Sequence, residues 1–418
     1  MLNRVRNALP SAPARSLILL ACGQGIAAVA GLSYGKLAAI YISPTVWGEY
    51  SLLFITMALL YSLFITPTLQ SFKAALSQFS PKQVFTFYSR MLAGLYLALA
   101  LPVLLATTYY QTPIFGIIWG VAVGQGIFQF GSNYLNATGQ HRGFTLLQAG
   151  NSLSTLLVFT FVVIGFHQRT LTGIWLVLLI VNSSWSVIVI WRLFRTHGTP
   201  ISHQETTAAL YQPYRQYVGP LVSLAFWGWL INYADRFLIR IYLSEADVGQ
   251  YAMGYGLGSK LLLLVAPLLS LLSPKVLQTR AAGKPPETAN PLIGRYLIYY
   301  VFLASAVCLF YYANRDWIGN LLLSENYTMA YFIGPIVAAG YLFLTSIHLL
   351  ELKWYVFGHT KFVLWHNVLG AILHVGFNLL LIPRMGITGA AIATLTGFVG
   401  QFLLACWLFM KPTKSVDS

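Results

Sequence analysis

Residues 241–251 read IYLSEADVGQY, and residues 40–50 read IYISPTVWGEY. The two stretches align without a gap and share isoleucine, tyrosine, serine, glycine and tyrosine at the same places. Two further pairs follow in the same order: ATGQHRGF at 137–144 with VFGHTKFV at 356–363, and TLTGI at 170–174 with GITGA at 386–390. The chain therefore contains an internal duplication, and each copy supplies half of the fold.

The composition is that of a membrane protein. Hydrophobic residues make up 57% of the 418 residues and charged residues only 8%, whereas a soluble protein of this size needs a large charged exterior. Apolar runs long enough to cross a bilayer recur along the whole chain. A transmembrane barrel is excluded, because its strands would be short and would alternate in polarity.

The sequence predicts an all-α polytopic membrane protein with about twelve transmembrane helices. The expected spans are 16–42, 46–69, 84–108, 113–136, 143–166, 171–193, 218–242, 247–273, 292–314, 328–352, 360–383 and 387–410. A duplicated six-span unit crosses the membrane an even number of times, so both copies face the same way and form two pseudo-symmetric six-helix lobes around a central cavity. The expected domains are an N-terminal lobe at 1–200, a cytoplasmic linker at 201–217 and a C-terminal lobe at 218–418.

Loop charges predict the orientation. With the N-terminus inside, nearly all basic loop residues are cytoplasmic, the exceptions being Arg169, Arg315 and Arg384. Both termini are therefore expected in the cytoplasm. The net charge of +15 is explained in the same way, because cytoplasmic basic residues also contact anionic headgroups. Membrane lipids are expected partners, and nucleic acid is not.

Three longer stretches resemble a known family: GKLAAIYISPTVWGEYSLLFI at 35–55, YADRFLIRIYLSEADVGQYAMGYGLGSK at 233–260 and NLLLIPRMGITGAAIATLTGFVGQ at 378–401. With the spans and the central loop, they resemble the bacterial polysaccharide flippases (Wzx-type polysaccharide biosynthesis proteins) of the multidrug/oligosaccharidyl-lipid/polysaccharide exporter superfamily. The resemblance implies two six-helix lobes around a cavity that carries basic residues. It covers nearly the whole chain.

The resemblance also implies a function. The chain would move undecaprenyl-diphosphate-linked oligosaccharide across the bacterial inner membrane, by alternating access, for O-antigen, capsule or exopolysaccharide synthesis. No cofactor is implied, but such transport is often coupled to an ion, here a proton or sodium. Polysaccharide polymerase and chain-length machinery are implied partners. The sugar, the pathway, the coupling ion and the oligomeric state stay open.

An acid and a base stand side by side in the seventh expected span. Asp235 and Arg236 lie in its outer third, and Asn232 shares roughly one face of the helix with them. Ionisable residues inside a membrane usually face the bundle interior and do functional work. The alternatives are a structural ion pair between helices and an arginine that reaches outward to the interface.

Three more cations lie within spans. Lys260 is near the middle of the eighth span, where an unpaired ammonium costs roughly 3 kcal/mol or more. Lys36 and Arg240 are closer to the outer interface, so each could instead reach out to water. Together with Arg236 they could form an electropositive lumen, which the diphosphate of such a substrate requires on losing water.

Polar residues of the last spans are further candidates. Glu351 has His348 one turn before it, a pair that could take up a coupling proton or simply form an interfacial hydrogen bond. His374 and Asn378 share a stripe with Asn367 in the eleventh span. They could bind substrate in the lumen or form hydrogen bonds between helices.

Two other function classes fit the sequence less well. A drug or cation exporter of the same superfamily should have an acidic cavity, whereas basic residues outnumber acids within these spans. A membrane polymerase or ligase would need a large periplasmic loop, and the expected outer loops are short. The chain has no Walker A motif, and we expect a transporter, not an enzyme.

Overall fold

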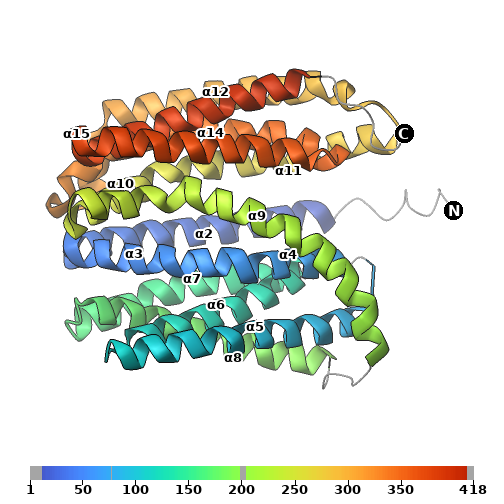
Figure 1. Cartoon of the computed structure of the whole chain (residues 1–418), viewed down its shortest axis with the longest axis horizontal. Coiled ribbons are helices and arrows are strands. Elements are labelled where there is room, and N and C mark those ends of the chain that lie inside the picture. Colours follow the sequence, from blue (N-terminus) through green and yellow to red (C-terminus); the bar gives the residue numbers. More distant parts are fainter. Residues whose placement is uncertain (1–11, 77, 198–203, 412–418) are drawn as a thin grey trace. The chain divides into compact units, whose positions relative to one another are not determined.

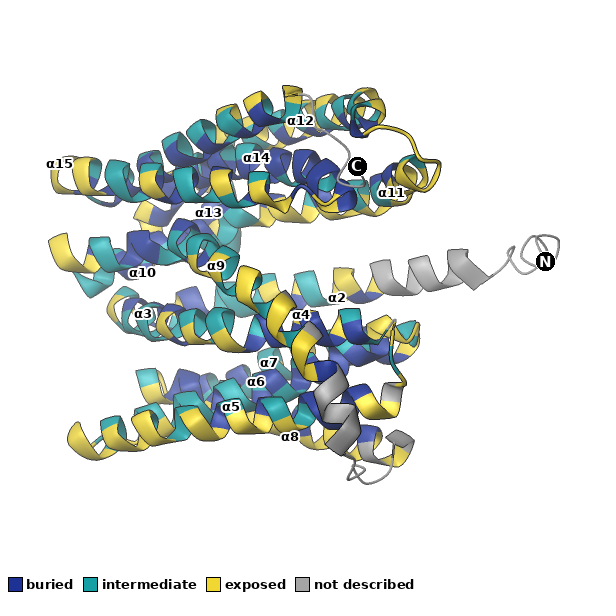
Figure 2. Ribbon diagram, turned by 45° about the vertical axis from the view of Figure 1, so that its right-hand side comes forward, coloured by how far each residue is buried: buried dark blue, intermediate teal, exposed yellow. Residues whose placement is uncertain are grey.

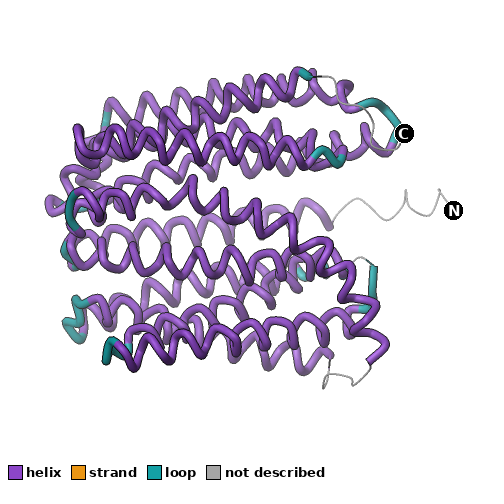
Figure 3. The backbone as a smooth tube through the Cα atoms, viewed as in Figure 1, coloured by secondary structure: helices purple, strands orange, loops and turns teal. Residues whose placement is uncertain are grey.

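The computed structural model describes residues 12–76, 78–197 and 204–411, and its regular elements over these residues are all helical (Figure 3). The first part contains α2 (Ala12–Tyr41), α3 (Pro44–Leu60), the π-helix η1 (Tyr61–Ile65), α4 (Thr66–Ala75), α5 (Pro81–Tyr109), α6 (Ile114–Ala137), α7 (His141–Phe159), the π-helix η2 (Thr160–Gly165) and α8 (Leu171–His197). The second contains α9 (Gln204–Tyr242), α10 (Glu245–Gly258), the 3₁₀ turn η3 (Ser259–Leu261), α11 (Leu262–Ala281), η4 (Pro286–Ala289), α12 (Asn290–Ala313), α13 (Arg315–Leu322), η5 (Glu325–Tyr327), α14 (Thr328–Phe357) and α15 (Thr360–Met410).

The chain is a multi-pass membrane protein. Within the described residues, 9 helical stretches are long and apolar enough to cross a membrane. One of them, α15, is two helices, because Gly386 leaves the helical conformation (φ 61°, ψ −145°) and separates 360–385 from 387–410. The break coincides with the boundary expected between the last two spans. The count of twelve spans stays a prediction.

The segment expected to be a linker is mostly helical. α9 begins at Gln204 and runs without interruption to Tyr242, so it joins residues 204–217 to the following span. Its first turns are rich in glutamine, glutamate, alanine and leucine, all good helix formers. Residues 201–203 lie outside the described part of the chain.

The chain divides into two compact units. Unit 1 comprises residues 1–42 and 56–225, and unit 2 comprises residues 43–55 and 226–418. The first turns of α3 therefore pack with the C-terminal half of the chain, and α9 passes from unit 1 into unit 2 (Figure 1). The expected division of domains at 200 and 218 places α3 entirely in the N-terminal lobe, so the two divisions differ there.

The duplication read from the sequence reappears in local geometry. Gly139 follows α6 and Gly358 follows α14, and both have left-handed backbones, with φ of 72° and 80°. These glycines occupy the same place in the aligned repeats. A glycine just past a helix end adopts this conformation without the clash that a Cβ would cause. The same residue thus ends the helix in both copies.

A second pair of repeat positions makes a direct contact inside unit 2. A Cβ on Gly48 would lie 1.8 Å from the carbonyl oxygen of Glu245, and a Cβ on Gly249 would lie 1.9 Å from that of Pro44. Each glycine thus receives the first turn of the other copy's helix, α10 or α3. Only a residue without a side chain permits such an approach of two backbones.

Unit 1 has an aromatic core. Phe72 and Phe130 are buried with ring centroids 4.4 Å apart, and Tyr88 packs on Phe72 and hydrogen-bonds Ser71 at 2.6 Å. The π-helix η1 ends two residues before Pro67, which lacks an N–H for the regular helical ladder. Sequence thus explains both the packing and the local widening.

Unit 2 is built around α14. In the span that contains α14, 78% of the most apolar 18-residue stretch is buried, whereas in the span formed by α5 the buried share of that stretch is 11%. It packs against α10, α11, α12 and α15. Figure 2 shows the same contrast between α14 and the outward faces of α5 and α12. Those exposed faces carry large apolar side chains, as surfaces that contact lipid do.

Candidate functional site

Asp235 and Arg236 lie in the interior of unit 2. The Asp235 side chain is fully buried and that of Arg236 is 7% exposed, and Nη1 of Arg236 lies 3.5 Å from Oδ1 of Asp235. The backbone N–H of Arg236 donates to the same oxygen at 2.8 Å. Burying an ion pair costs desolvation energy, which only close pairing and further hydrogen bonds offset. The Asp235 carboxylate meets both conditions.

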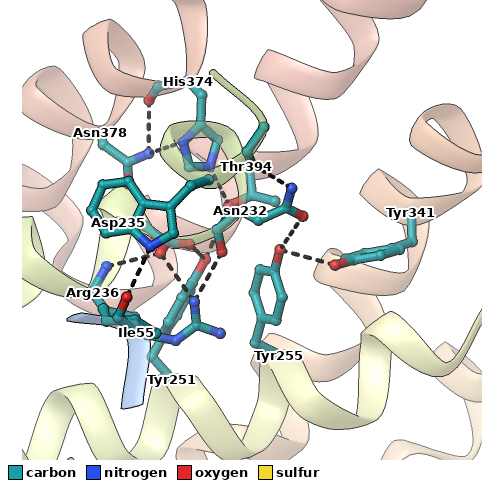
Figure 4. Close-up of polar contacts among 12 residues, drawn as sticks. Ile55, Asn232, Asp235, Arg236, Tyr251, Tyr255, Tyr341, His374, Asn378 and Thr394 are labelled. Carbon is teal, nitrogen blue, oxygen red and sulfur yellow. Dashed lines mark hydrogen bonds and ion pairs between the residues drawn. The ribbon is translucent and has the colours of Figure 1, made fainter. Parts of the chain in front are cut away.

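A chain of hydrogen bonds leads from Asp235 to α15 (Figure 4). The Tyr251 hydroxyl donates to Oδ2 of Asp235 at 2.6 Å. It lies 3.0 Å from Oγ1 of Thr394, which lies 3.1 Å from Nε2 of His374. An ionised carboxylate only accepts, so the order of donors runs from His374 through Thr394 and Tyr251 to Asp235. This order assigns the imidazole proton to Nε2.

The other face of His374 continues the network. The side-chain nitrogen of Asn378 donates to the His374 carbonyl at 2.7 Å and lies 3.5 Å from Nδ1 of the same residue. Oδ1 of Asn378 is buried and has no partner among the described residues. An unpaired buried acceptor is costly, so this oxygen is available to a proton donor or a cation.

Arg236 is enclosed by tyrosines. Its guanidinium carbon lies 4.5 Å from the Tyr255 ring centroid and 5.3 Å from that of Tyr233, a favourable placement for a buried cation. Nη1 donates to the Asn232 carbonyl at 2.9 Å, whereas Nε is buried and meets no acceptor in the described part of the chain. The Tyr341 hydroxyl donates to that of Tyr255 at 3.0 Å, which extends the network to α14.

The start of α10 helps to fix this arrangement. Ser244 and Asp247 form a capping box, in which the serine hydroxyl accepts from the Asp247 N–H at 3.2 Å and Asp247 accepts from the Ser244 N–H at 3.2 Å. Such caps satisfy the free N–H groups of a first helical turn. Trp229 on α9 donates to the carbonyl of Ile55 at 2.9 Å, so α9 is also tied to α3.

The structure brings together five of the predicted site residues. Asn232, Asp235, Arg236, His374 and Asn378 all belong to this network. The partners that sequence reasoning missed are Tyr251, Tyr255, Tyr341 and Thr394. A tyrosine in an apolar run reads as core packing. The sequence offered one signal for these partners: Tyr251 is the last shared residue of the repeated stretch 241–251.

The remaining cations lie elsewhere. Arg240 is half exposed and forms an ion pair with Glu245 across the turn between α9 and α10. Lys260 is exposed and lies in η3, the 3₁₀ turn between α10 and α11. A short 3₁₀ segment inside a long helix often marks a hinge. Lys36 is half-buried on α2 in unit 1.

Glu351 belongs to a second buried cluster. Its carboxylate lies 3.1 Å from Nε2 of His366 on α15. The sequence had paired it with His348, one turn earlier on the same helix. Asn367, expected on the stripe of His374, instead accepts from Gln401 at 3.3 Å within this second cluster.

Comparison with known proteins identifies the architecture. No protein-family model matches the chain, and no curated protein matches it in sequence. The lipid II flippase MurJ in an inward-closed conformation superposes with a TM-score of 0.75 at 12% identity, covering 94% of this chain and 88% of that one. An inward-facing multidrug-resistance MATE transporter of the MOP superfamily superposes with a TM-score of 0.68 at 12% identity, covering 94% and 98%. The Vibrio cholerae MATE transporter VcmN in its bent form gives 0.61 at 16% identity, covering 96% of each chain.

At these identities the likeness establishes the fold, and the chain is folded as the transporters of the MOP superfamily are.

Proposed function

We propose that this protein flips undecaprenyl-diphosphate-linked oligosaccharide across the bacterial inner membrane for surface polysaccharide synthesis, by alternating access, with both termini in the cytoplasm. The observation that carries the proposal is the likeness to a lipid II flippase over 94% of the chain. The excess of basic over acidic residues supports it, with a net charge of +15. A substrate with a diphosphate needs cations where it leaves water.

In this proposal Lys260 makes the first contact with the diphosphate. Its ammonium is exposed within a hinge-like turn, whereas Arg236 is already engaged by Asp235 and by tyrosines. Lys36 and Arg240 contribute further positive charge, and Asn232, His374 and Asn378 bind sugar or phosphate groups. Polymerase and chain-length machinery would act on the flipped product.

Ion coupling falls to the two buried carboxylates, Asp235 and Glu351. Each is held by a partner on another helix, Asp235 by Tyr251 on α10 and Glu351 by His366 on α15. A cation or proton that changed those partners would alter packing between the helices, so ion binding and helix arrangement would be linked. Proton and sodium are the candidate ions.

A deletion in the source organism tests the substrate class. Loss of surface polysaccharide together with accumulation of undecaprenyl-diphosphate oligosaccharide is the expected result. An unchanged pool with intact polymer, in a strain without a second flippase, would contradict it. Complementation with Lys260→Gln should neither restore the polymer nor clear the accumulated lipid-linked oligosaccharide. Lys284→Gln, which changes an exposed lysine after α11, serves as the matched control.

Drug export is the second candidate, because MATE multidrug transporters share the fold over 94–96% of the chain. The deletion strain separates the two. Raised susceptibility to cationic drugs with a normal lipid-linked pool would favour export, and the reverse pattern would favour flipping.

A further inference from the structure

The cluster around Glu351 lies apart from the Asp235 network and has its own chemistry. Oε1 of Glu351 and Nε2 of His366 are 3.1 Å apart, the Glu351 side chain is 11% exposed and that of His366 is fully buried. The contact is close but not aligned as a linear hydrogen bond, since Nε2 has no hydrogen-bond partner among the described residues. Within the same residues it is the one contact between a carboxylate and an imidazole.

The second ring nitrogen fixes the state of the imidazole. The side-chain nitrogen of Gln401 lies 3.1 Å from Nδ1 of His366 and donates to Oδ1 of Asn367 at 3.3 Å. With the Gln401 amide in this orientation its N–H donates to Nδ1, which assigns the ring proton to Nε2, on the side of the carboxylate. The Trp354 ring, whose centroid lies 5.5 Å from that of His366, covers the imidazole.

This arrangement can hold one additional proton. Without it, a neutral imidazole faces an ionised carboxylate, and the pair carries one negative charge in a buried place. With it on the Glu351 carboxyl, the pair is neutral overall.

Among the described residues, no lysine or arginine lies at ion-pair distance from Glu351, and its contact is with His366. Titratable or charged groups on the elements packed here include His348, Lys353 and Tyr355 on α14, Glu287 on η4, Lys275 and Arg280 on α11, Arg295, Tyr296 and Tyr300 on α12, and Lys361 and Cys406 on α15. Three of the cations are committed elsewhere: Lys275 donates to Tyr296, Arg280 to the Val356 carbonyl and Lys353 to the Phe409 carbonyl. His348 lies one turn before Glu351 on α14.

The pair also joins three helical segments. Glu351 is on α14, His366 is in the first part of α15, and Gln401 is in the part beyond the Gly386 break. A change from one buried negative charge to none alters the cost of keeping these segments packed together. A proton at this junction can therefore bias which arrangement of the helices is favoured.

We propose that the Glu351 carboxyl binds the coupling proton of this transporter, with His366 as its neighbour, held in place by Gln401. The role in coupling rests on the proposed transport function, but the proton site itself does not. One proton enters from water at the exposed edge of Glu351 and leaves by the same group. His348, the partner expected from the sequence, is then an accessory group and not the proton's main site.

Infrared difference spectra of the full-length protein in lipid, recorded through a pH titration, test the site directly. The carbonyl stretch of a protonated carboxyl should appear on acidification in the wild type and be lost in Glu351→Gln. It should be retained in Glu325→Gln, which removes an exposed carboxylate at the start of η5. A buried-carboxyl band that persists unchanged in Glu351→Gln would overturn the proposal.

His366→Asn supplies a second readout should Glu351→Gln fail to fold. Here the carboxyl band should remain but shift in frequency, because the N–H beside it is gone, and an unshifted band would also overturn the proposal. Flipping assays on the same preparations separate the two claims. A Glu351 band without transport of lipid-linked oligosaccharide would reject the proposed function and leave the proton site standing.

Discussion

The two units share a repeated framework but differ in what they bury. Among the described residues, the buried polar side chains of unit 1 are all hydroxyls: Thr68, Ser71, Thr86, Ser132, Thr145 and Ser186. Those of unit 2 include Asp235, Arg236, Glu351, Lys353, His366 and His374. Charged groups are expensive inside a membrane protein and mark working parts. The duplication thus preserved the frame, while the ionisable groups gathered in the second unit.

The largest expected effect is at the buried ion pair. Asp235→Asn leaves Arg236 buried without its counter-charge, which should destabilise the protein by about 3–5 kcal/mol. For comparison in unit 1, Tyr88→Phe removes the hydrogen bond to Ser71 and should cost about 1 kcal/mol. Thermal unfolding of the purified proteins, followed by tryptophan fluorescence, measures both.

The double variant Asp235→Leu with Arg236→Met sharpens this prediction. Replacing both charges by apolar groups should recover most of the lost stability. A double variant as unstable as Asp235→Asn would show that the hydrogen-bond network, and not the unpaired charge, sets the cost.

The next effect concerns the contact between the repeats. Gly48→Ala places a methyl group where the Glu245 carbonyl lies, and relieving that clash should cost about 1–3 kcal/mol. Gly249→Ala should match it, because the contact is reciprocal. Gly294→Ala on α12 is the control, since a Cβ there meets nothing within 4 Å among the described residues. Equal melting temperatures for Gly48→Ala and Gly294→Ala would refute the close approach.

The paired helix ends compare the two units directly. Alanine at Gly139 or at Gly358 forces a Cβ into the left-handed region, at a cost of about 1–2 kcal/mol in either unit. Similar losses for the two variants, measured by thermal unfolding, would show that the repeats are energetically alike here. A loss at one position alone would mean that the sequence match at this turn does not extend to energetics.

The smallest effect is a pH dependence at His359, in the turn before α15 and outside the spans. Burial, aided by Lys361 and Lys353, lowers the pKa of His359 below its usual 6.5. The unfolded chain therefore binds more protons than the folded protein near and below that pH, so stability falls as the pH drops through about 6.5. Melting temperatures from pH 8 to 5 should fall less steeply in His359→Gln than in the wild type, and parallel curves would contradict the assignment.

The sequence predicted much of the frame. Apolar runs located the helices closely, as for 113–136, which is α6 at Ile114–Ala137, and the glycine-based repeats marked the turns. The helical start of α9 was missed, because a polar stretch between spans reads as a loop.

The site was predicted only in part. Asp235 and Arg236 stood out, because charge is rare in this chain. Their partners did not, since Tyr251 and Thr394 resemble ordinary span residues. Glu351 was paired with His348 because only neighbours along one helix can be read from a single sequence. The contact with His366 comes from the packing of α14 on α15.

Reconstituted flipping tests the account most directly. Purified protein in vesicles, with labelled undecaprenyl-diphosphate oligosaccharide in the outer leaflet, should render the label inaccessible to an impermeant glycosidase over time. We predict protection with the wild type and with Lys284→Gln, and slow or absent protection with Lys260→Gln. Protection no greater than in protein-free vesicles would contradict the proposed function, and full activity in Lys260→Gln would remove its proposed cationic contact.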